Sequence, residues 1–163
     1  MNNSTNIILK IISIGFFLHF LQLLLLLNSS GFGSFNLLFL VYGGASLITA
    51  ILLWTFPKVG IAIALIRSII GIFWAIMLGQ FLNLSLIGTP TQLNIWPSAF
   101  FLVSIMLLLY IARTEAIYVK SNSNMGSSLG KFPKLILIFL ALLVFIGMIY
   151  FLLTYLSLFT NLH

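Results

Sequence analysis

Charged residues are scarce in this sequence of 163 residues: they make up 5% of it, and Glu115 is its single acidic residue. Soluble domains contain about 25% charged residues, so this chain has too few to cover a globule with a surface that water wets. Disordered chains are excluded as well, because they combine low hydrophobicity with high charge. The composition therefore indicates a protein that folds inside a membrane.

Cysteine is absent, which excludes disulfides, thiolate metal sites and thiol nucleophiles. A single acid also excludes paired catalytic carboxylates, and two histidines are too few for a metal-ligand cluster. We therefore expect no enzymatic activity, no metal and no cofactor, with a bound lipid or quinone kept as an option. The chain matches no family signature that we recognise.

Apolar residues make up 62% of the chain, with a mean hydropathy of +1.26. They form five continuous segments, and each is long enough for a helix across a bilayer, which needs about 20 residues. The sequence predicts an all-α integral membrane protein with one transmembrane domain over residues 1–163. The expected helices cover residues 7–27, 37–56, 59–82, 96–112 and 135–159, with Pro97 in the first turn of the fourth. Pro57 and Lys58 predict a tight hairpin between the second and third helices.

The seven Lys and Arg residues give the chain a net charge of +6. They lie beside apolar segments, a pattern that favours membrane topology signals over nucleic-acid binding. Five crossings place all the boundary cations on one side, so the N-terminus is expected inside and the C-terminus outside. These cations are Lys10, Lys58, Arg113, Lys120, Lys131 and Lys134. The expected location is the cytoplasmic (inner) membrane, with an organelle inner membrane as the alternative.

The loop at about residues 119–131 is rich in small polar residues, which predicts a flexible inside loop. Its basic flanks allow two interpretations, an ordinary cytoplasmic loop or a docking site for a partner or an anionic lipid. The basic residues concerned are Arg113, Lys120, Lys131 and Lys134.

Small residues recur every three or four positions along the third helix, which predicts a face for close helix packing. They are Gly60, Ala64, Ser68, Gly71, Ala75 and Gly79, and the second helix carries Gly43, Ser46 and Ala50 at similar spacing. We expect these two helices to pack as a close hairpin at the centre of the bundle. A permeation path lined by glycines is the alternative.

Three polar residues, His19, Arg67 and Ser104, each lie nine positions from a boundary cation. At 1.5 Å per residue this places them about 13 Å deep, close to the bilayer midplane. Gln22 shares the face of His19, and Ser46 and Thr49 reach a similar level. A purely structural interpretation of this layer is also open. In it, His19 is a packed or hydrogen-bonded residue, and the hydroxyls of Ser46, Thr49 and Ser104 bond to the backbone of their own helices.

Arg67 is the anomaly of this layer, because a charged arginine near the midplane is costly and the one acid, Glu115, lies near the inner surface. Either backbone carbonyls and partial snorkelling solvate it, or an acidic side chain, a lipid phosphate or an anionic cofactor approaches it.

Two functions from different classes follow from this sequence. The favoured one is a small non-catalytic polytopic subunit that packs within and stabilises a larger membrane complex, of respiratory, photosynthetic or transport type. Its partners would be other integral membrane subunits and membrane lipids, with no nucleic acid. The alternative is a small self-contained transporter or channel, or a quinone- or lipid-binding membrane protein, that uses the polar layer of His19 and Arg67.

Overall fold

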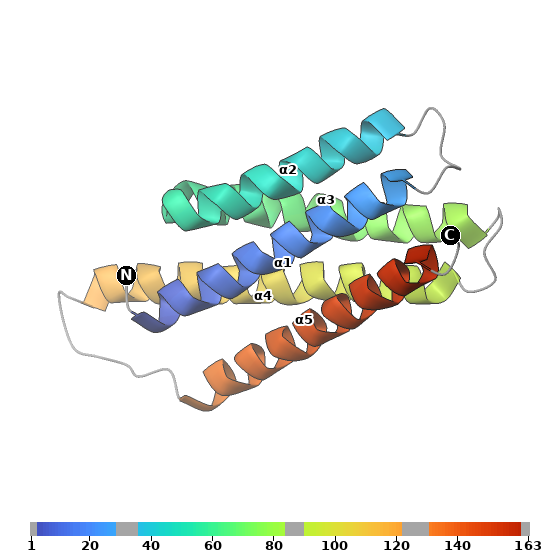
Figure 1. Ribbon diagram of the computed structural model, residues 1–163. Coiled ribbons are helices and arrows are strands. Elements are labelled where there is room, and N and C mark those ends of the chain that lie inside the picture. Colours follow the sequence, from blue (N-terminus) through green and yellow to red (C-terminus); the bar gives the residue numbers. More distant parts are fainter. Residues whose placement is uncertain (1–2, 29–35, 84–89, 122–130, 161–163) are drawn as a thin grey trace.

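The computed structural model describes residues 3–28, 36–83, 90–121 and 131–160 (Figure 1). In this part of the chain every element is an α-helix, and no strand occurs. The helices are α1 (Asn3–Asn28), α2 (Asn36–Thr55), α3 (Pro57–Asn83), α4 (Pro90–Ser121) and α5 (Lys131–Thr160). The all-helical class and the five helices are thus confirmed.

Proline positions explain where several helices begin and end. Proline disfavours a helical conformation at the residue before it, and α2 ends at Thr55 just ahead of Phe56 and Pro57. Pro57 and Pro90 each occupy the first position of a helix, where the missing N–H costs no hydrogen bond.

The fourth helix differs most from its predicted range of 96–112. It begins six residues earlier, continues to Ser121, and contains Pro97 in its interior instead of its first turn. A single internal proline removes only one backbone hydrogen bond. Here that loss does not end the helix. The predicted inside loop of 119–131 is shortened accordingly, since 119–121 and 131 are helical and 122–130 lie outside the described residues.

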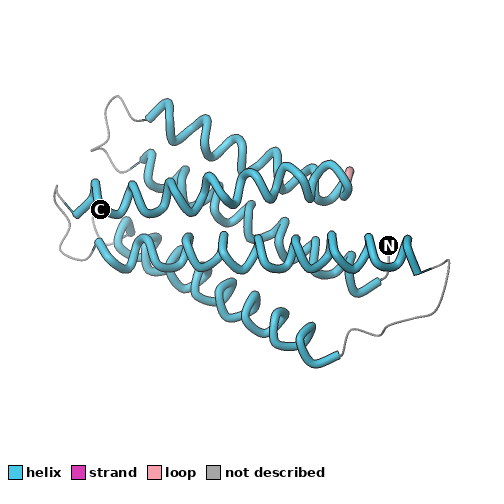
Figure 2. The backbone as a smooth tube through the Cα atoms, turned by 180° about the vertical axis from the view of Figure 1, so that it is seen from behind, coloured by secondary structure: helices cyan, strands magenta, loops and turns pink. Residues whose placement is uncertain are grey.

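The helices are arranged in two layers, with α3 and α4 behind and α2, α1 and α5 in front (Figure 1). Packed pairs are α1 with α2, α4 and α5, α3 with α2 and α4, and α4 with α5. The start of α1 and the end of α5 lie at opposite ends of the bundle, as the view from behind also shows (Figure 2). The start of α1, the turn between α2 and α3, and the end of α4 share one end of the bundle (Figure 1).

Among the described residues, buried apolar side chains form two clusters. The larger one joins all five helices and includes Phe16, Ala64, Phe101, Leu108 and Val144. A smaller one contains Leu23, Phe39 and Tyr42, with Leu27 and Trp74 packed against it.

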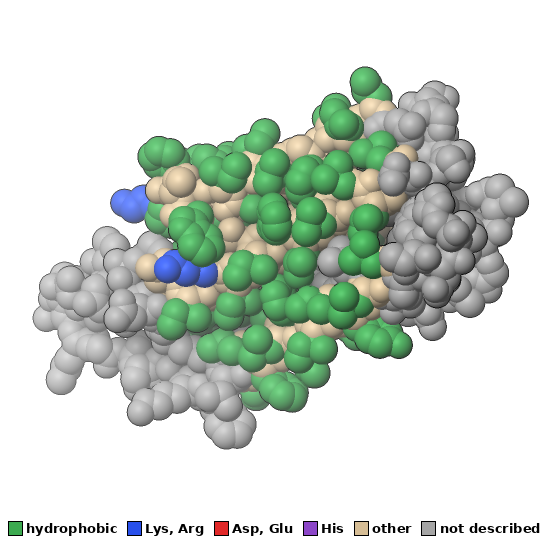
Figure 3. Space-filling model, viewed as in Figure 1, with side chains coloured by type: hydrophobic (Ala, Val, Ile, Leu, Met, Phe, Trp, Pro, Cys, Tyr) green, Lys and Arg blue, Asp and Glu red, His purple; other side chains and the backbone are tan. Residues whose placement is uncertain are grey.

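The outer surface of the bundle is also apolar, and each helix exposes at least one large apolar side chain. Examples are Phe17 (43% exposed), Ile48 (58%), Phe73 (66%), Leu109 (55%) and Phe139 (61%). Figure 3 shows such side chains covering one face, with the visible Lys and Arg side chains at one end. Within the described residues, three helices contain stretches long and apolar enough to cross a membrane, over Thr5–Leu25, Pro57–Met77 and Trp96–Thr114. Shorter apolar stretches lie in α2, at Phe39–Thr55, and in α5, at Ile138–Gly147.

The hairpin of α2 and α3 depends on Gly60. Only Phe56 separates the two helices, and the Phe56 carbonyl accepts a hydrogen bond from the Gly60 amide at 2.8 Å. A Cβ at Gly60 would lie 2.7 Å from the backbone of Leu52 and Leu53. Glycine is therefore required where the helices meet.

Beyond this turn, the small residues of α2 and α3 serve different partners. A Cβ at Gly71 would lie 2.7 Å from the Phe101 ring of α4, so this part of the face packs on α4. Gly43 instead faces Phe20 and Leu23 of α1. The close hairpin of α2 and α3 is thus formed at Gly60, and further from the turn Gly71 packs on α4 and Gly43 packs on α1.

Candidate functional site

Arg67 is 4% exposed and lies between α2 and α4 in the interior of the bundle. Its Nη2 donates hydrogen bonds to the carbonyl oxygen of Tyr42 at 3.1 Å and to the hydroxyl of Ser46 at 2.5 Å. Its guanidinium carbon lies 3.5 Å from the centre of the Tyr42 ring and 5.4 Å from that of Phe101. Arg67 therefore contacts both apolar clusters, Tyr42 in the smaller and Phe101 in the larger.

His19 of α1 lies beside this arginine contact. Its ring packs edge-on against Phe101, with centroids 4.9 Å apart, and against Tyr42 at 5.8 Å. The Gln22 side chain, one turn along α1, approaches the ring. Neither ring nitrogen of His19 has a hydrogen-bond partner that meets both distance and angle criteria among the described residues. Both side chains are buried, at 5% exposed each.

Trp74 completes the group from α3. Its ring stacks on Tyr42, with centroids 4.9 Å apart. We call Arg67, Tyr42, Trp74 and His19 the arginine cluster. Its side chains come from α1, α2 and α3, and Phe101 of α4 forms one wall.

Several polar atoms of the arginine cluster are buried and have no hydrogen-bond partner among the described residues. They are Nε and Nη1 of Arg67, the hydroxyl of Tyr42, Nε1 of Trp74 and the ring nitrogens of His19. The guanidinium lies over the Tyr42 ring, and the phenol oxygen is left without a hydrogen bond. Each unsatisfied buried donor costs roughly 1–3 kcal/mol, so these atoms lower the free energy of unfolding.

No acidic side chain among the described residues balances the charge of Arg67. The side chain of Glu115 lies outside the described residues, but its place in α4 is known. Fourteen residues of helix separate it from Phe101 (115 minus 101), or about 21 Å at 1.5 Å per residue. That separation is too long for an ion pair.

The hydroxyls of α2 bond to their own helix, as the structural interpretation predicted. Thr49 donates to the carbonyl of Ala45 at 2.7 Å, and Ser46 donates to that of Tyr42 at 3.3 Å. Ser46 also accepts from Arg67, so it serves the arginine cluster as well. Another hydroxyl, that of Ser13, links α1 to α2 by donating to the Ala50 carbonyl at 2.7 Å.

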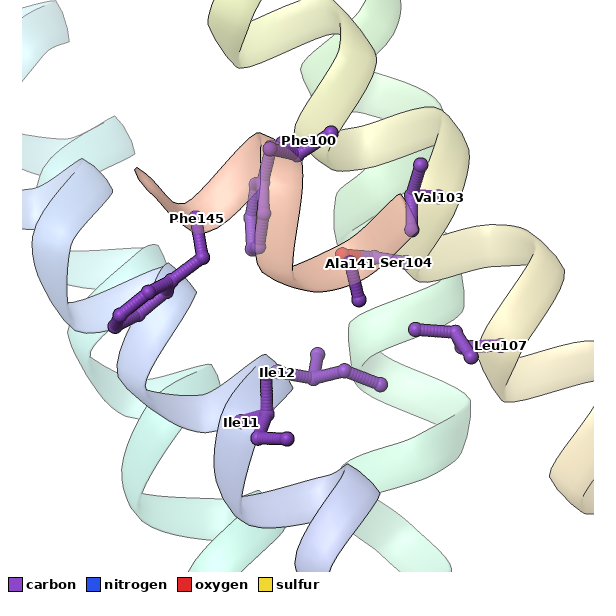
Figure 4. Close-up of a pocket in the computed structure, with 9 residues that line it drawn as sticks. Ile11, Ile12, Phe100, Val103, Ser104, Leu107, Ala141 and Phe145 are labelled. Carbon is purple, nitrogen blue, oxygen red and sulfur yellow. The ribbon is translucent and has the colours of Figure 1, made fainter. Parts of the chain in front are cut away.

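Ser104 does not join the arginine cluster. It is 2% exposed and lines a pocket between α1, α4 and α5, and no member of the arginine cluster is among the residues that line this pocket (Figure 4). The other lining residues are apolar: Ile11, Ile12, Phe100, Val103, Leu107, Ala141, Val144 and Phe145. The expected layer therefore divides into the arginine cluster and a separate, largely apolar pocket.

The remaining candidate residues divide between packing and the surface. Four of the small residues of α3, namely Gly60, Ala64, Ser68 and Gly71, are buried, as is Ala75 at 6% exposed. The hydroxyl of Ser68 has no hydrogen-bond partner within the described residues. The surroundings of Gly79 and the side chains of Lys120, Lys131 and Lys134 lie outside the described part of the chain. Arg113 is exposed.

Sequence reasoning missed Tyr42, Trp74 and Phe101, because aromatic residues in apolar segments are ordinarily core or interface residues. One signal for Tyr42 was available. With the helices joined at Phe56, Arg67 lies eleven positions after the turn, opposite residue 45, within one helical turn of Tyr42 and Ser46.

Comparison with known proteins gives no relative: no family model, no curated protein and no solved structure matches this chain.

Proposed function

We propose that all five helices cross a membrane, with the N-terminus inside and the C-terminus outside. The shortest, α2, has 20 residues and a length of about 30 Å, which matches the hydrocarbon core of a bilayer. The exposed cations Lys10, Lys58 and Arg113 support the orientation. They belong to the first half of α1, the first turn of α3 and the last third of α4, and the start of α1, the start of α3 and the end of α4 share one end of the bundle.

Within that membrane, the chain acts as a small non-catalytic subunit that packs against other integral membrane proteins and against lipids. The observation that carries this proposal is the apolar periphery. Exposed side chains such as Ile48, Phe73, Leu109 and Phe139 lie on four different helices, so the bundle offers apolar packing surfaces in several directions. Large exposed apolar surfaces mark contacts with membranes or with protein partners.

Site-specific photo-crosslinking in native membranes tests the proposal. A photoreactive amino acid is introduced singly at Ile48, Phe73, Leu109 and Phe139, and at the fully buried Phe101 as the matched control. We expect one or more of the exposed positions to give a discrete crosslinked product with another membrane protein, and Phe101 to give none.

Mild solubilisation followed by native mass measurement provides the second readout. A complex that contains other chains in fixed stoichiometry supports the subunit proposal. Crosslinks to lipid alone at all four exposed positions, together with a mass that corresponds only to copies of this chain, would contradict it. That result would favour the self-contained alternative.

A further inference from the structure

We propose that the arginine cluster is a binding site for one oxyanion, a carboxylate or a phosphate group, held by Arg67, Tyr42 and Trp74. Binding here does not require a partner chain, so this site and the subunit function can fail independently.

The first support is the supply of hydrogen-bond donors. Arg67 carries unused N–H groups on Nε and Nη1, Tyr42 has an unused hydroxyl, and Trp74 has an unused indole N–H. Guanidinium and indole groups donate and do not accept. These three side chains belong to one connected group, since Tyr42 contacts both of the others. A ligand that satisfies them must therefore be rich in acceptor oxygens.

The second support is charge. Arg67 is 4% exposed, and no acidic side chain among the described residues pairs with it. Its two hydrogen bonds go to neutral oxygens, the Tyr42 carbonyl and the Ser46 hydroxyl. An anion would supply the missing negative charge, and guanidinium binds carboxylate and phosphate with two parallel hydrogen bonds. A neutral ligand would leave the charge unbalanced.

The third support is the shape of the surroundings. His19 and Phe101 enclose the group with their rings, and both are buried, as is Tyr42 at 9% exposed. Trp74 is partly exposed and is thus the member nearest the surface of the bundle. Because Trp74 stacks on Tyr42, we expect its fluorescence to respond when an anion binds in the arginine cluster.

The experiment titrates the purified full-length chain in mild detergent with three oxyanion probes, each with its own control. Sodium phosphate and sodium acetate, each compared with sodium chloride at equal ionic strength, test a free oxyanion. Phosphatidylglycerol, compared with phosphatidylcholine in mixed micelles, tests a lipid headgroup. Tryptophan fluorescence and the midpoint of thermal unfolding are recorded at each concentration.

We expect a saturable change in both readouts with one or more of the phosphate, acetate and phosphatidylglycerol probes. Arg67→Leu abolishes it, and Tyr42→Phe, which removes one donor and keeps the ring, weakens the apparent affinity by about two- to tenfold. Trp74→Phe removes the fluorescence change and weakens the thermal response. Matched controls are Trp54→Phe, an exposed tryptophan, and Ser68→Ala, a buried neighbour of Arg67; both keep the parental affinity.

Two results would overturn the site: no saturable response to any of the three oxyanion probes, or a response that Arg67→Leu leaves unchanged. If Arg67→Leu does not fold, the ring-preserving variants decide. Unchanged thermal responses in both Tyr42→Phe and Trp74→Phe would then refute the assignment. A response to phosphate or acetate identifies a free ion as ligand, and a response confined to phosphatidylglycerol identifies a headgroup.

Discussion

Tyr42 receives Arg67 in two ways at once: the guanidinium carbon lies 3.5 Å above the centre of its ring, and Nη2 donates to its carbonyl oxygen at 3.1 Å. Because Tyr42 belongs to α2 and Arg67 to α3, this double contact fixes the two helices relative to each other. It also solvates the charge with groups from the chain itself.

Removing the charge of Arg67 should cost the fold little. We expect Arg67→Met to leave the free energy of unfolding unchanged or to raise it, because replacing a buried, incompletely paired charge by an apolar side chain of similar size is often neutral or stabilising. Unfolding in mixed micelles with increasing SDS measures this. A loss of several kcal/mol would show that Arg67 is retained for stability and not for binding.

Removing the Ser46 hydroxyl while keeping the charge of Arg67 should destabilise the fold more than Arg67→Met does. We expect Ser46→Ala to lower the free energy of unfolding by about 1–3 kcal/mol, because one hydrogen bond of the buried guanidinium is lost. The matched control is Thr49→Ala, whose hydroxyl bonds only within α2. Equal effects of the two substitutions in the same assay would argue against a special role for Ser46.

The close approach of α2 and α3 predicts opposite effects at two glycines. Gly60→Ala should destabilise by roughly 1–3 kcal/mol, because its Cβ would meet the backbone of Leu52. Gly44→Ala should be neutral or stabilise by up to about 1 kcal/mol. No atom of the described residues lies within 4 Å of the added Cβ, and alanine favours a helix more than glycine does. Thermal unfolding of the two variants compares them directly, and an unaffected Gly60→Ala would contradict the geometry of the turn.

The hydrogen bond from Ser13 to the Ala50 carbonyl predicts a modest contribution to the packing of α1 on α2. We expect Ser13→Ala to lower the free energy of unfolding by roughly 0.5–1.5 kcal/mol. Thr55→Ala is the control, because that exposed hydroxyl bonds to the preceding turn of its own helix. A loss no larger than the control's would show that the Ser13 bond adds nothing.

The absence of cysteine makes the topology directly measurable. Single cysteines at Ser29, Asn83 and Asn161 should react with an impermeant reagent applied from outside. Cysteines at Lys58 and Ser123 should react only after permeabilisation. Reaction at Ser123 in intact cells would contradict five crossings with the N-terminus inside.

The apolar segments predicted the helices because a run of about 20 apolar residues has few alternatives to a helix. Boundaries were harder to predict. The helix α4 continues through polar residues beyond residue 112, and Pro97 lies inside this helix without ending it. Depth along the membrane also predicted that Arg67, His19 and Ser46 would share a level. It could not predict the direction in which each side chain points, so the position of Ser104 in a separate pocket was not foreseen, and Tyr42 and Trp74 were missed.

The one-residue turn at Phe56 makes this hairpin sensitive to length in a way that substitutions do not reveal. Adding or deleting one residue between Ser46 and Arg67 rotates one helix by about 100° relative to the other. The Arg67 guanidinium would then lose its contacts with Tyr42. A one-residue turn is too short to compensate for the rotation. Between these two residues, homologous chains should therefore differ in residue type but keep the number of residues.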